Sequence, residues 1–229
     1  MDIVCILDTE TTGLDPEKGA KCIEVAAVRY SLKHASIVDV VSRLLPSETN
    51  EAEAINHIPV KLLDLGTQAQ IDAWNDIANV ALSCDAILAH NAEFDSKWVP
   101  DRLRAHPWIC TCKDVDWPKQ TRRNEKLVHL AVDSGLVVNP GQSHRAIYDC
   151  LLIADLLMQT AKDGVDIVAM MERAWRTKHE YRANVRFENN HLAKNAGFMW
   201  DSKRRGWFRL MCEEDVAGLS FQVEKVGVT

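Results

Sequence analysis

The sequence predicts an α/β fold, in which helices flank a mixed sheet and a small α+β C-terminal domain follows. Segments 3–7, 22–30 and 36–45 are rich in valine and isoleucine and are separated by glycine and proline, so they predict three consecutive strands. Short apolar runs at 86–90 and 108–112 then alternate with segments of helical spacing. Consecutive strands followed by strand–helix alternation are typical of a mixed sheet with helices on its faces.

The helices are predicted from apolar residues spaced three and four positions apart. We expect them near 51–65 and over 70–82, 93–104, 124–134 and 144–161. The first domain is expected to span residues 1–164 and the second 165–229, because Lys162, Asp163 and Gly164 interrupt the helical pattern. In the second domain we expect helices over 165–176, 189–196 and 213–217, strands over 183–187, 207–211 and 220–226, and a turn at 201–206.

Composition limits the class of protein. The chain has 229 residues, of which 47% are hydrophobic and 26% charged, and its formal net charge is −6. This charge argues against binding nucleic acid by a broad basic surface, but it permits recruitment of phosphate through metal ions. No apolar run approaches the roughly 20 residues of a membrane-spanning helix, and the N-terminus lacks a basic export signal. We therefore expect a cytoplasmic protein without membrane contact.

Seven cysteines are scattered without the spacing of a disulfide framework, so we expect reduced thiols in the core. Cys110 and Cys112, with His106 nearby, suggest zinc ligands. The pair lacks a matching second pair, which favours the interpretation as core residues.

Carboxylates occupy positions where the pattern calls for apolar side chains. Because side chains alternate along a strand, Asp8 and Glu10 continue the face that carries Val4 and Ile6. The alternative is that both acids lie in a solvated turn just beyond the strand.

Two further acids come from helical segments. Asp95 shares a predicted helix face with Trp98 and Val99, although a first-turn or capping position would also explain it. Asp149 lies on a helix that is apolar nearly all round, where a buried carboxylate needs a cation or a salt bridge to an Arg or Lys. Three separate elements thus deliver acids to the interior, and oxygen ligands at this density favour Mg²⁺ or Mn²⁺.

His144 precedes the buried helix, five residues ahead of Asp149 and at the same end. An unperturbed imidazole titrates at a pKa of about 6.5, which suits it to accept a proton from water near neutral pH. A cap or surface position is the alternative for a histidine at the start of a helix.

Three motifs make the sequence resemble the DnaQ-like DEDDh 3′→5′ exonuclease superfamily. They are Asp8-Thr9-Glu10-Thr11-Thr12-Gly13-Leu14, His90-Asn91-Ala92-Glu93-Phe94-Asp95 and His144-Arg145-Ala146-Ile147-Tyr148-Asp149. Their order and spacing match those of the superfamily, and the probability that all three motifs agree by chance is very small. The resemblance covers residues 1–162 and is closest to the bacterial exonuclease X group, with Trp108-Ile109-Cys110-Thr111 as a supporting detail.

The resemblance implies a ribonuclease-H-like fold and a metal-dependent 3′→5′ exonuclease with two Mg²⁺ ions, for which Mn²⁺ substitutes. It implies that Asp8, Glu10, Asp95 and Asp149 hold the ions and that His144 is the general base. It also implies that the terminal nucleotide contacts Thr11, Leu14, His90, Asn91 and Phe94.

Two basic regions remain open to alternative interpretations. The segment with Lys113, Lys119, Arg122, Arg123 and Lys126 either forms a solvated loop or follows the substrate backbone. In the last 65 residues, Lys194, Lys203, Arg204, Arg205 and Arg209 accompany Phe198, Trp200, Trp207 and Phe208. These aromatic residues either stack on bases or form the core of the small domain.

From this resemblance we expect hydrolysis of phosphodiester bonds at 3′ ends of nucleic acid, with DNA that is single-stranded or frayed preferred to RNA. The first alternative is a 3′→5′ exoribonuclease that trims RNA ends. The second is a proofreading or scaffold subunit of a replication or repair complex. A homodimer or a partner protein bound through residues 165–229 is a further expectation.

Overall fold

The computed structural model describes residues 1–120, 125–139 and 141–227. Two compact units, Met1–Trp175 and Arg176–Thr229, make up the chain, and each is described by itself. The division lies after residue 175 and not at the expected position after 164, because the helix that follows residue 164 packs into the core of the first unit.

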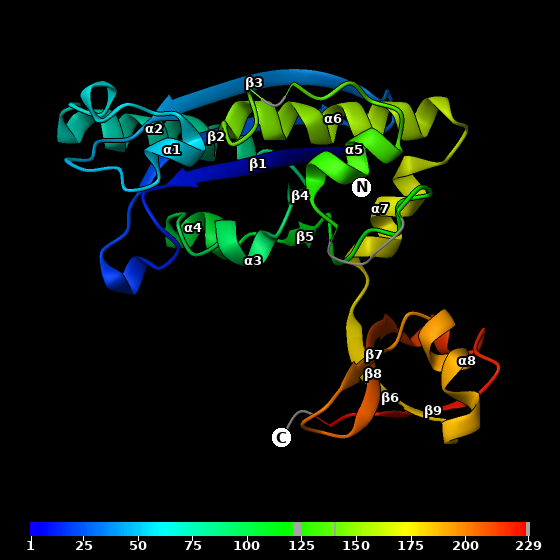
Figure 1. The fold of residues 1–229 in the computed structure, drawn as a ribbon. Coiled ribbons are helices and arrows are strands. Elements are labelled where there is room, and N and C mark those ends of the chain that lie inside the picture. Colours follow the sequence, from blue (N-terminus) through cyan, green and yellow to red (C-terminus); the bar gives the residue numbers. More distant parts are fainter. Residues whose placement is uncertain (121–124, 140, 228–229) are drawn as a thin grey trace. The chain divides into compact units, whose positions relative to one another are not determined.

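A mixed five-stranded sheet forms the centre of the first unit, with strand order β3-β2-β1-β4-β5 (Figure 1). The strands are β1 (Ile3–Thr11), β2 (Cys22–Ser31), β3 (Ser36–Leu44), β4 (Ala86–Ala89) and β5 (Trp108–Cys110). β1, β2 and β3 pair antiparallel, whereas β4 and β5 join parallel to β1. The predicted α/β class with a mixed sheet is therefore confirmed.

Helices cover both faces of this sheet. On one face lie α6 (Ala146–Lys162), α5 (Leu127–Asp133) and α7 (Ile167–Trp175), which share a core with alternate residues of β1 and β2. On the other lies α2 (Thr67–Ala81), which buries Ala73, Trp74 and Ile77. Two short elements, α1 (Glu53–Asn56) and η2 (Val60–Leu62), precede α2. No helix in the described residues is long and apolar enough to cross a membrane.

The segment after β4 differs from the sequence prediction. In place of one helix over 93–104 the structure has two single turns, α3 (Ala92–Asp95) and α4 (Asp101–Arg104). Pro100 has an extended backbone between them, with ψ 153°, and proline lacks the N–H that a continuous helix would need. Because of this break, Asp95 does not share a helical face with Trp98 and Val99, contrary to the prediction.

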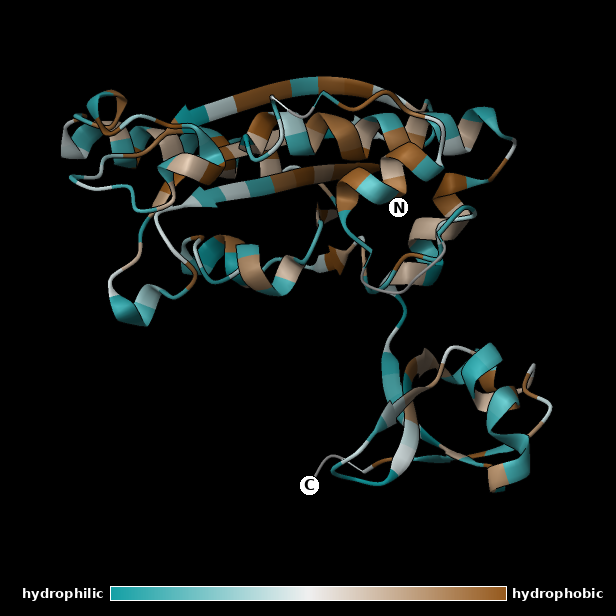
Figure 2. Ribbon diagram, viewed as in Figure 1, coloured by the Kyte–Doolittle hydropathy of each residue, from teal (hydrophilic) through white to brown (hydrophobic). Residues whose placement is uncertain are grey.

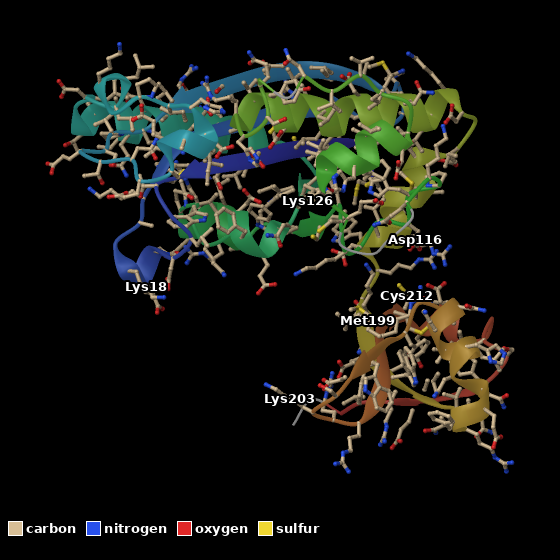
Figure 3. The ribbon with its side chains drawn as sticks, in the orientation of Figure 1. Lys18, Asp116, Lys126, Met199, Lys203 and Cys212 are labelled. Atoms are coloured by element: carbon tan, nitrogen blue, oxygen red, sulfur yellow. The ribbon has the colours of Figure 1, made fainter. Side chains whose placement is uncertain are left out.

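The second unit has an antiparallel four-stranded sheet in the order β7-β8-β6-β9. Its elements are β6 (Lys178–Asn184), η3 (Phe187–Asn189), α8 (Asn190–Asn195), β7 (Met199–Asp201), β8 (Gly206–Cys212), α9 (Glu213–Val216) and β9 (Gln222–Lys225). The strand predicted over 183–187 was wrong, because the pairing with β8 begins at Lys178 and ends at Ala183. The predicted turn at 201–206 connects β7 and β8, and Figure 3 labels Lys203 there.

The aromatic residues of the second unit divide between its core and its surface. Phe198 and Phe208 are buried, and Phe208 is covered by the guanidinium of Arg204, 3.7 Å from its ring centre. Trp207 is half-buried and donates a hydrogen bond to Asn190 at 3.0 Å. Trp200 is 53% exposed. The core interpretation therefore holds for Phe198 and Trp207, which pack in the hydrophobic core of this unit. Phe208 lies under Arg204 outside that core, and Trp200 is exposed.

Candidate active site

The C-terminal half of β1 carries two acids on the face that α6 covers. Val4 and Ile6 lie in the core on the α6 side, and alternation places Asp8 and Glu10 on that same side. Figure 2 shows β1 changing from hydrophobic to hydrophilic residues toward its end. The β1–β2 register shifts immediately after Glu10, and such bulges re-aim side chains at functional sites.

Asp95 reaches β1 from α3. Its carboxylate is 2% exposed and accepts hydrogen bonds from the backbone N–H and the hydroxyl of Thr9, at 3.0 and 2.8 Å. Thr9 lies between Asp8 and Glu10, so these bonds fix Asp95 beside both acids. Sequence reasoning assigned no role to Thr9, although it stands inside the first motif.

The start of α6 delivers the fourth acid and the imidazole. Asp149 lies in the first turn of α6 and accepts a hydrogen bond from the backbone N–H of His144. His144 adopts the left-handed conformation, with φ 63°, and is exposed. Side-chain atoms of Glu10, His144 and Asp149 lie within 4.8 Å of one another. The structure thus brings the five predicted catalytic residues to one end of the sheet; their individual roles stay predictions.

Burial raises the pKa values of all four acids, and nearby carboxylates raise those of Asp8, Glu10 and Asp149 further. Burial raises the pKa of Asp8 well above its usual value, and the carboxylates of Asp95, Asp149 and Glu10 add to this effect. Burial and the Asp149 carboxylate raise the pKa of Glu10 to about 8. Burial is also the main cause that raises the pKa of Asp95 to about 7 and that of Asp149 to about 6.

Such a cluster is stable in its ionised form when cations are bound among the oxygens. The donor set consists of carboxylate oxygens and one imidazole nitrogen, which fits a hard divalent cation. The Cys110 and Cys112 thiols belong to a different place: their sulfur atoms lie 3.4 Å apart in a small apolar cluster with Ala89 and Ala92.

A fifth acid, which the sequence analysis did not single out, lies beside this cluster. Glu24 is 1% exposed and stands directly opposite Glu10 in the β1–β2 register. It forms a two-pronged ion pair with Arg145, at 2.8 and 3.0 Å, and accepts the backbone N–H of Ala146 at 3.0 Å. The signal in the sequence was a lone acid within the apolar run that forms β2.

The predicted nucleotide contacts surround the same end of the sheet. Leu14 is 84% exposed and lines a groove of about 850 Å³ together with Pro16 and Lys97. Figure 3 labels Lys18, which lines this groove as well. The Thr11 hydroxyl donates to the carbonyl of Gly13 at 2.6 Å.

The second-motif residues are held by the protein itself. Both ring nitrogens of His90 have partners, the Thr111 hydroxyl at 3.0 Å and the carbonyl of Glu125 at 2.7 Å. Asn91 adopts φ 85°, and the Phe94 ring packs against Trp98 with ring centres 5.6 Å apart and the ring planes tilted by 58°. The contacts of these residues with a nucleotide stay predictions.

The basic segment between the second and third motifs is only partly described. Lys113 pairs with Glu93 at 2.9 Å, and Lys119 pairs with Asp163 at 2.7 Å. Lys126 is exposed just before α5. Arg122 and Arg123, on which the backbone-tracking hypothesis depended, lie outside the described residues.

A mixed sheet with acids contributed by β1, α3 and α6 defines a nuclease of the ribonuclease-H-like class. The chain belongs to the Exonuclease family (RNase_T), whose model matches residues 5–157. It is accordingly an enzyme that hydrolyses nucleic acid, of the DEDDh type. A second model, for a domain of unknown function (DUF8626), matches residues 179–226 in the second unit.

Two relatives illustrate the likeness. Exodeoxyribonuclease 10 of Escherichia coli strain K12 is 30% identical over 162 residues, which are 67% of this chain and 66% of the relative. A solved structure described as Exonuclease X in complex with 5′ overhanging duplex DNA is 27% identical, with a TM-score of 0.53, over 75% of this chain and 99% of that one. The match therefore spans slightly less than two thirds of the curated relative.

A third likeness supports the fold. The nuclease domain of 3′hExo, described as a DEDDh family member bound to rAMP, has a TM-score of 0.55 at 20% identity, over 72% of this chain and 94% of that one. The predicted ribonuclease-H-like fold and the predicted superfamily are confirmed by these comparisons.

Proposed function

We propose that this enzyme removes nucleotides from the 3′ end of DNA, on single-stranded or frayed ends, by hydrolysis with two divalent ions. The observation that carries the proposal is the gathering of four carboxylates beside the imidazole of His144: Asp95 is buried, and Asp8, Glu10 and Asp149 are half-buried. Membership of the exonuclease family supports the reaction class. The likeness to Exodeoxyribonuclease 10 and to a DNA-bound Exonuclease X supports DNA as the substrate.

The four carboxylates are the proposed ligands of two Mg²⁺ ions, with Mn²⁺ able to replace them. When bound, such ions supply Lewis acidity that polarises the scissile phosphate and lowers the pKa of the attacking water. The chain's own residues orient the reaction: Thr9 holds Asp95 against β1, and the His144 amide holds Asp149.

His144 is the proposed general base. Its ring stands within 4.8 Å of Glu10 and Asp149 and is exposed, so it can reach a water molecule above the acids and release the accepted proton to solvent. The terminal nucleotide is proposed to contact residues of the first and second motifs, namely Thr11, Leu14, His90, Asn91 and Phe94.

The second unit is proposed to add contact with longer substrates through Trp200, whose ring is 53% exposed, and Lys203 on the same β7–β8 hairpin. Stacking of one base on an aromatic ring contributes about 1–3 kcal/mol. Trp200→Ala should therefore raise KM on a 30-mer and leave KM on a 4-mer unchanged. An unchanged KM on both substrates would favour the alternative that this unit binds a partner protein or a second copy.

A time course on labelled oligonucleotides tests the proposal. DNA and RNA of one sequence, single-stranded and duplex, carry a label at either the 5′ or the 3′ end and are incubated with Mg²⁺, Mn²⁺ or EDTA. We expect a 3′ label to appear at once as a mononucleotide and a 5′ label to yield a descending ladder, faster on DNA and absent in EDTA. Asp8→Asn should abolish both the release of mononucleotide and the ladder. His144→Ala should lower kcat by about 10²–10⁴-fold.

If RNA is degraded faster than DNA, RNA takes the place of DNA as the proposed substrate. Internal cleavage, or undiminished activity of folded Asp8→Asn, would contradict it.

A further inference from the structure

Glu24 adds a fifth carboxylate to the acid cluster at the active site. Its carboxylate is buried on the same face as Glu10 and directly opposite it, where a fifth metal ligand would be expected. Its oxygens are instead occupied by Arg145 and by the amide of Ala146. The Ser42 hydroxyl adds a longer contact at 3.4 Å.

We propose that Glu24 and Arg145 form a positioning clamp that fixes His144 over the acids of β1. The inference rests on the proposed function and assigns a role to two residues outside the metal ligands. The clamp joins the N-terminal end of β2 to Arg145, the residue between His144 and the first turn of α6. It therefore acts on the imidazole and on Asp149 through the backbone.

The backbone conformation explains why such a clamp is needed. His144 has φ 63°, a conformation that a non-glycine residue adopts at a cost unless its surroundings hold it. Arg145 is extended, with φ −119° and ψ 124°, and α6 starts at the next residue. Three hydrogen bonds to one buried carboxylate hold this short connection.

An arginine–glutamate pair suits this role better than a lysine–glutamate pair would. Arginine binds a carboxylate with two parallel N–H donors, which fixes orientation as well as distance. The pair also neutralises Glu24, so its oxygens do not compete with Glu10 for a cation. A charge pair with a buried member need not stabilise the fold. The effect to measure is therefore the positioning of His144.

Two substitutions test the clamp while keeping the fold. Arg145→Lys keeps the positive charge but loses the two-pronged geometry. Glu24→Gln keeps the size of the side chain but directs an amide N–H2 toward one of the donors. The matched control is Arg43→Gln, which breaks the Arg43–Asp76 pair at 2.9 Å between β3 and α2, outside the acid cluster.

The first readout separates kcat from KM on a short single-stranded oligonucleotide at saturating Mn²⁺. Misplacement of a catalytic group by about 1 Å costs roughly 10²-fold in rate. We therefore expect kcat to fall by roughly 10²-fold in Arg145→Lys and Glu24→Gln, with KM unchanged, and we expect Arg43→Gln to behave as the wild type.

The second readout is hydrogen–deuterium exchange of the 143–150 segment in the metal-free protein. We expect faster exchange there in both clamp variants and no change in Arg43→Gln. Wild-type kcat in either folded clamp variant, or unchanged exchange in 143–150, would overturn the clamp. An inactive wild-type protein would instead overturn the proposed function, while the exchange measurement would still test the clamp.

Discussion

Replacing Asp149 with asparagine is expected to stabilise the metal-free protein while abolishing its activity. Burial is the main cause that raises the pKa of Asp149 from its usual 3.8 to about 6. An acid whose pKa is higher in the folded than in the unfolded state destabilises the fold above the folded pKa, and has no such effect below the unfolded pKa. The penalty therefore develops as the pH rises from about 4 to about 6.

The magnitude follows from the two pKa values. Their difference corresponds to roughly 3 kcal/mol of destabilisation at pH 8. Asparagine removes the charge and keeps a carbonyl oxygen for the His144 amide, so part of this energy should be recovered, about 1–3 kcal/mol. In a protein of this size each kcal/mol raises the melting temperature by roughly 2–4 °C.

Thermal unfolding in EDTA between pH 4 and pH 8 provides the assay. We expect Asp149→Asn to melt above the wild type at pH 8 and to lose this advantage near pH 4. The control is Asp163→Asn, because hydrogen bonds from Lys119 and Gln159 lower the pKa of Asp163, so its replacement should not stabilise. Saturating Mn²⁺ should stabilise the wild type, by about 2.7 kcal/mol at a hundred times Kd, and the variant less. A lower melting temperature for Asp149→Asn in EDTA at pH 8 would refute the reasoning.

Three further substitutions test contacts in the acid cluster, in the core under α2 and in the second unit. Thr9→Val removes one of two hydrogen bonds to the buried Asp95 carboxylate, so urea unfolding should show a loss of about 1–3 kcal/mol and the exonuclease assay a lower kcat. Ile77→Ala should cost about 2–5 kcal/mol because Ile77 is fully buried in α2, whereas Ile71→Ala on the same helix, 50% exposed, should cost less than half as much. Gly206→Ala places a methyl group 2.9 Å from a phenylalanine ring carbon, so proteolysis of the second unit should accelerate while the melting of the first stays unchanged.

The strands and the acid positions were predictable because they depend on local patterns. Alternation along β1 placed Asp8 and Glu10 on the face of Val4 and Ile6, and the structure has them there. The apolar surface of the helix around Asp149 predicted that this helix is buried, and α6 is indeed packed on β1 and β2. Asp149 itself is half-buried.

Long-range polar contacts were not predictable in the same way. Sequence reasoning allowed a salt bridge between Asp149 and an Arg or Lys, whereas the nearby Arg145 pairs with Glu24. Asn56 is fully buried and donates to the carbonyl of Thr11 at the end of β1, a contact between segments 45 residues apart. Such pairs depend on the path of the chain, which residue patterns do not specify.

The expected boundary after residue 164 and the division after residue 175 differ for a related reason. α6 ends at Lys162, and Lys162, Asp163 and Gly164 were interpreted as the domain boundary. The apolar side chains of α7 that follow, Ile167, Met171 and Ala174, complete the core of the first unit. A turn in the sequence does not reveal whether the next helix returns to the same core.

The proposed role of the four carboxylates is to hold divalent ions. Crystals of the protein soaked in Mn²⁺ and measured by anomalous diffraction test it directly. We expect two anomalous peaks about 3.5–4 Å apart, in contact with Asp8, Glu10, Asp95 and Asp149. A map without peaks among these oxygens at saturating Mn²⁺, or with an ion bound only elsewhere, would contradict the claim.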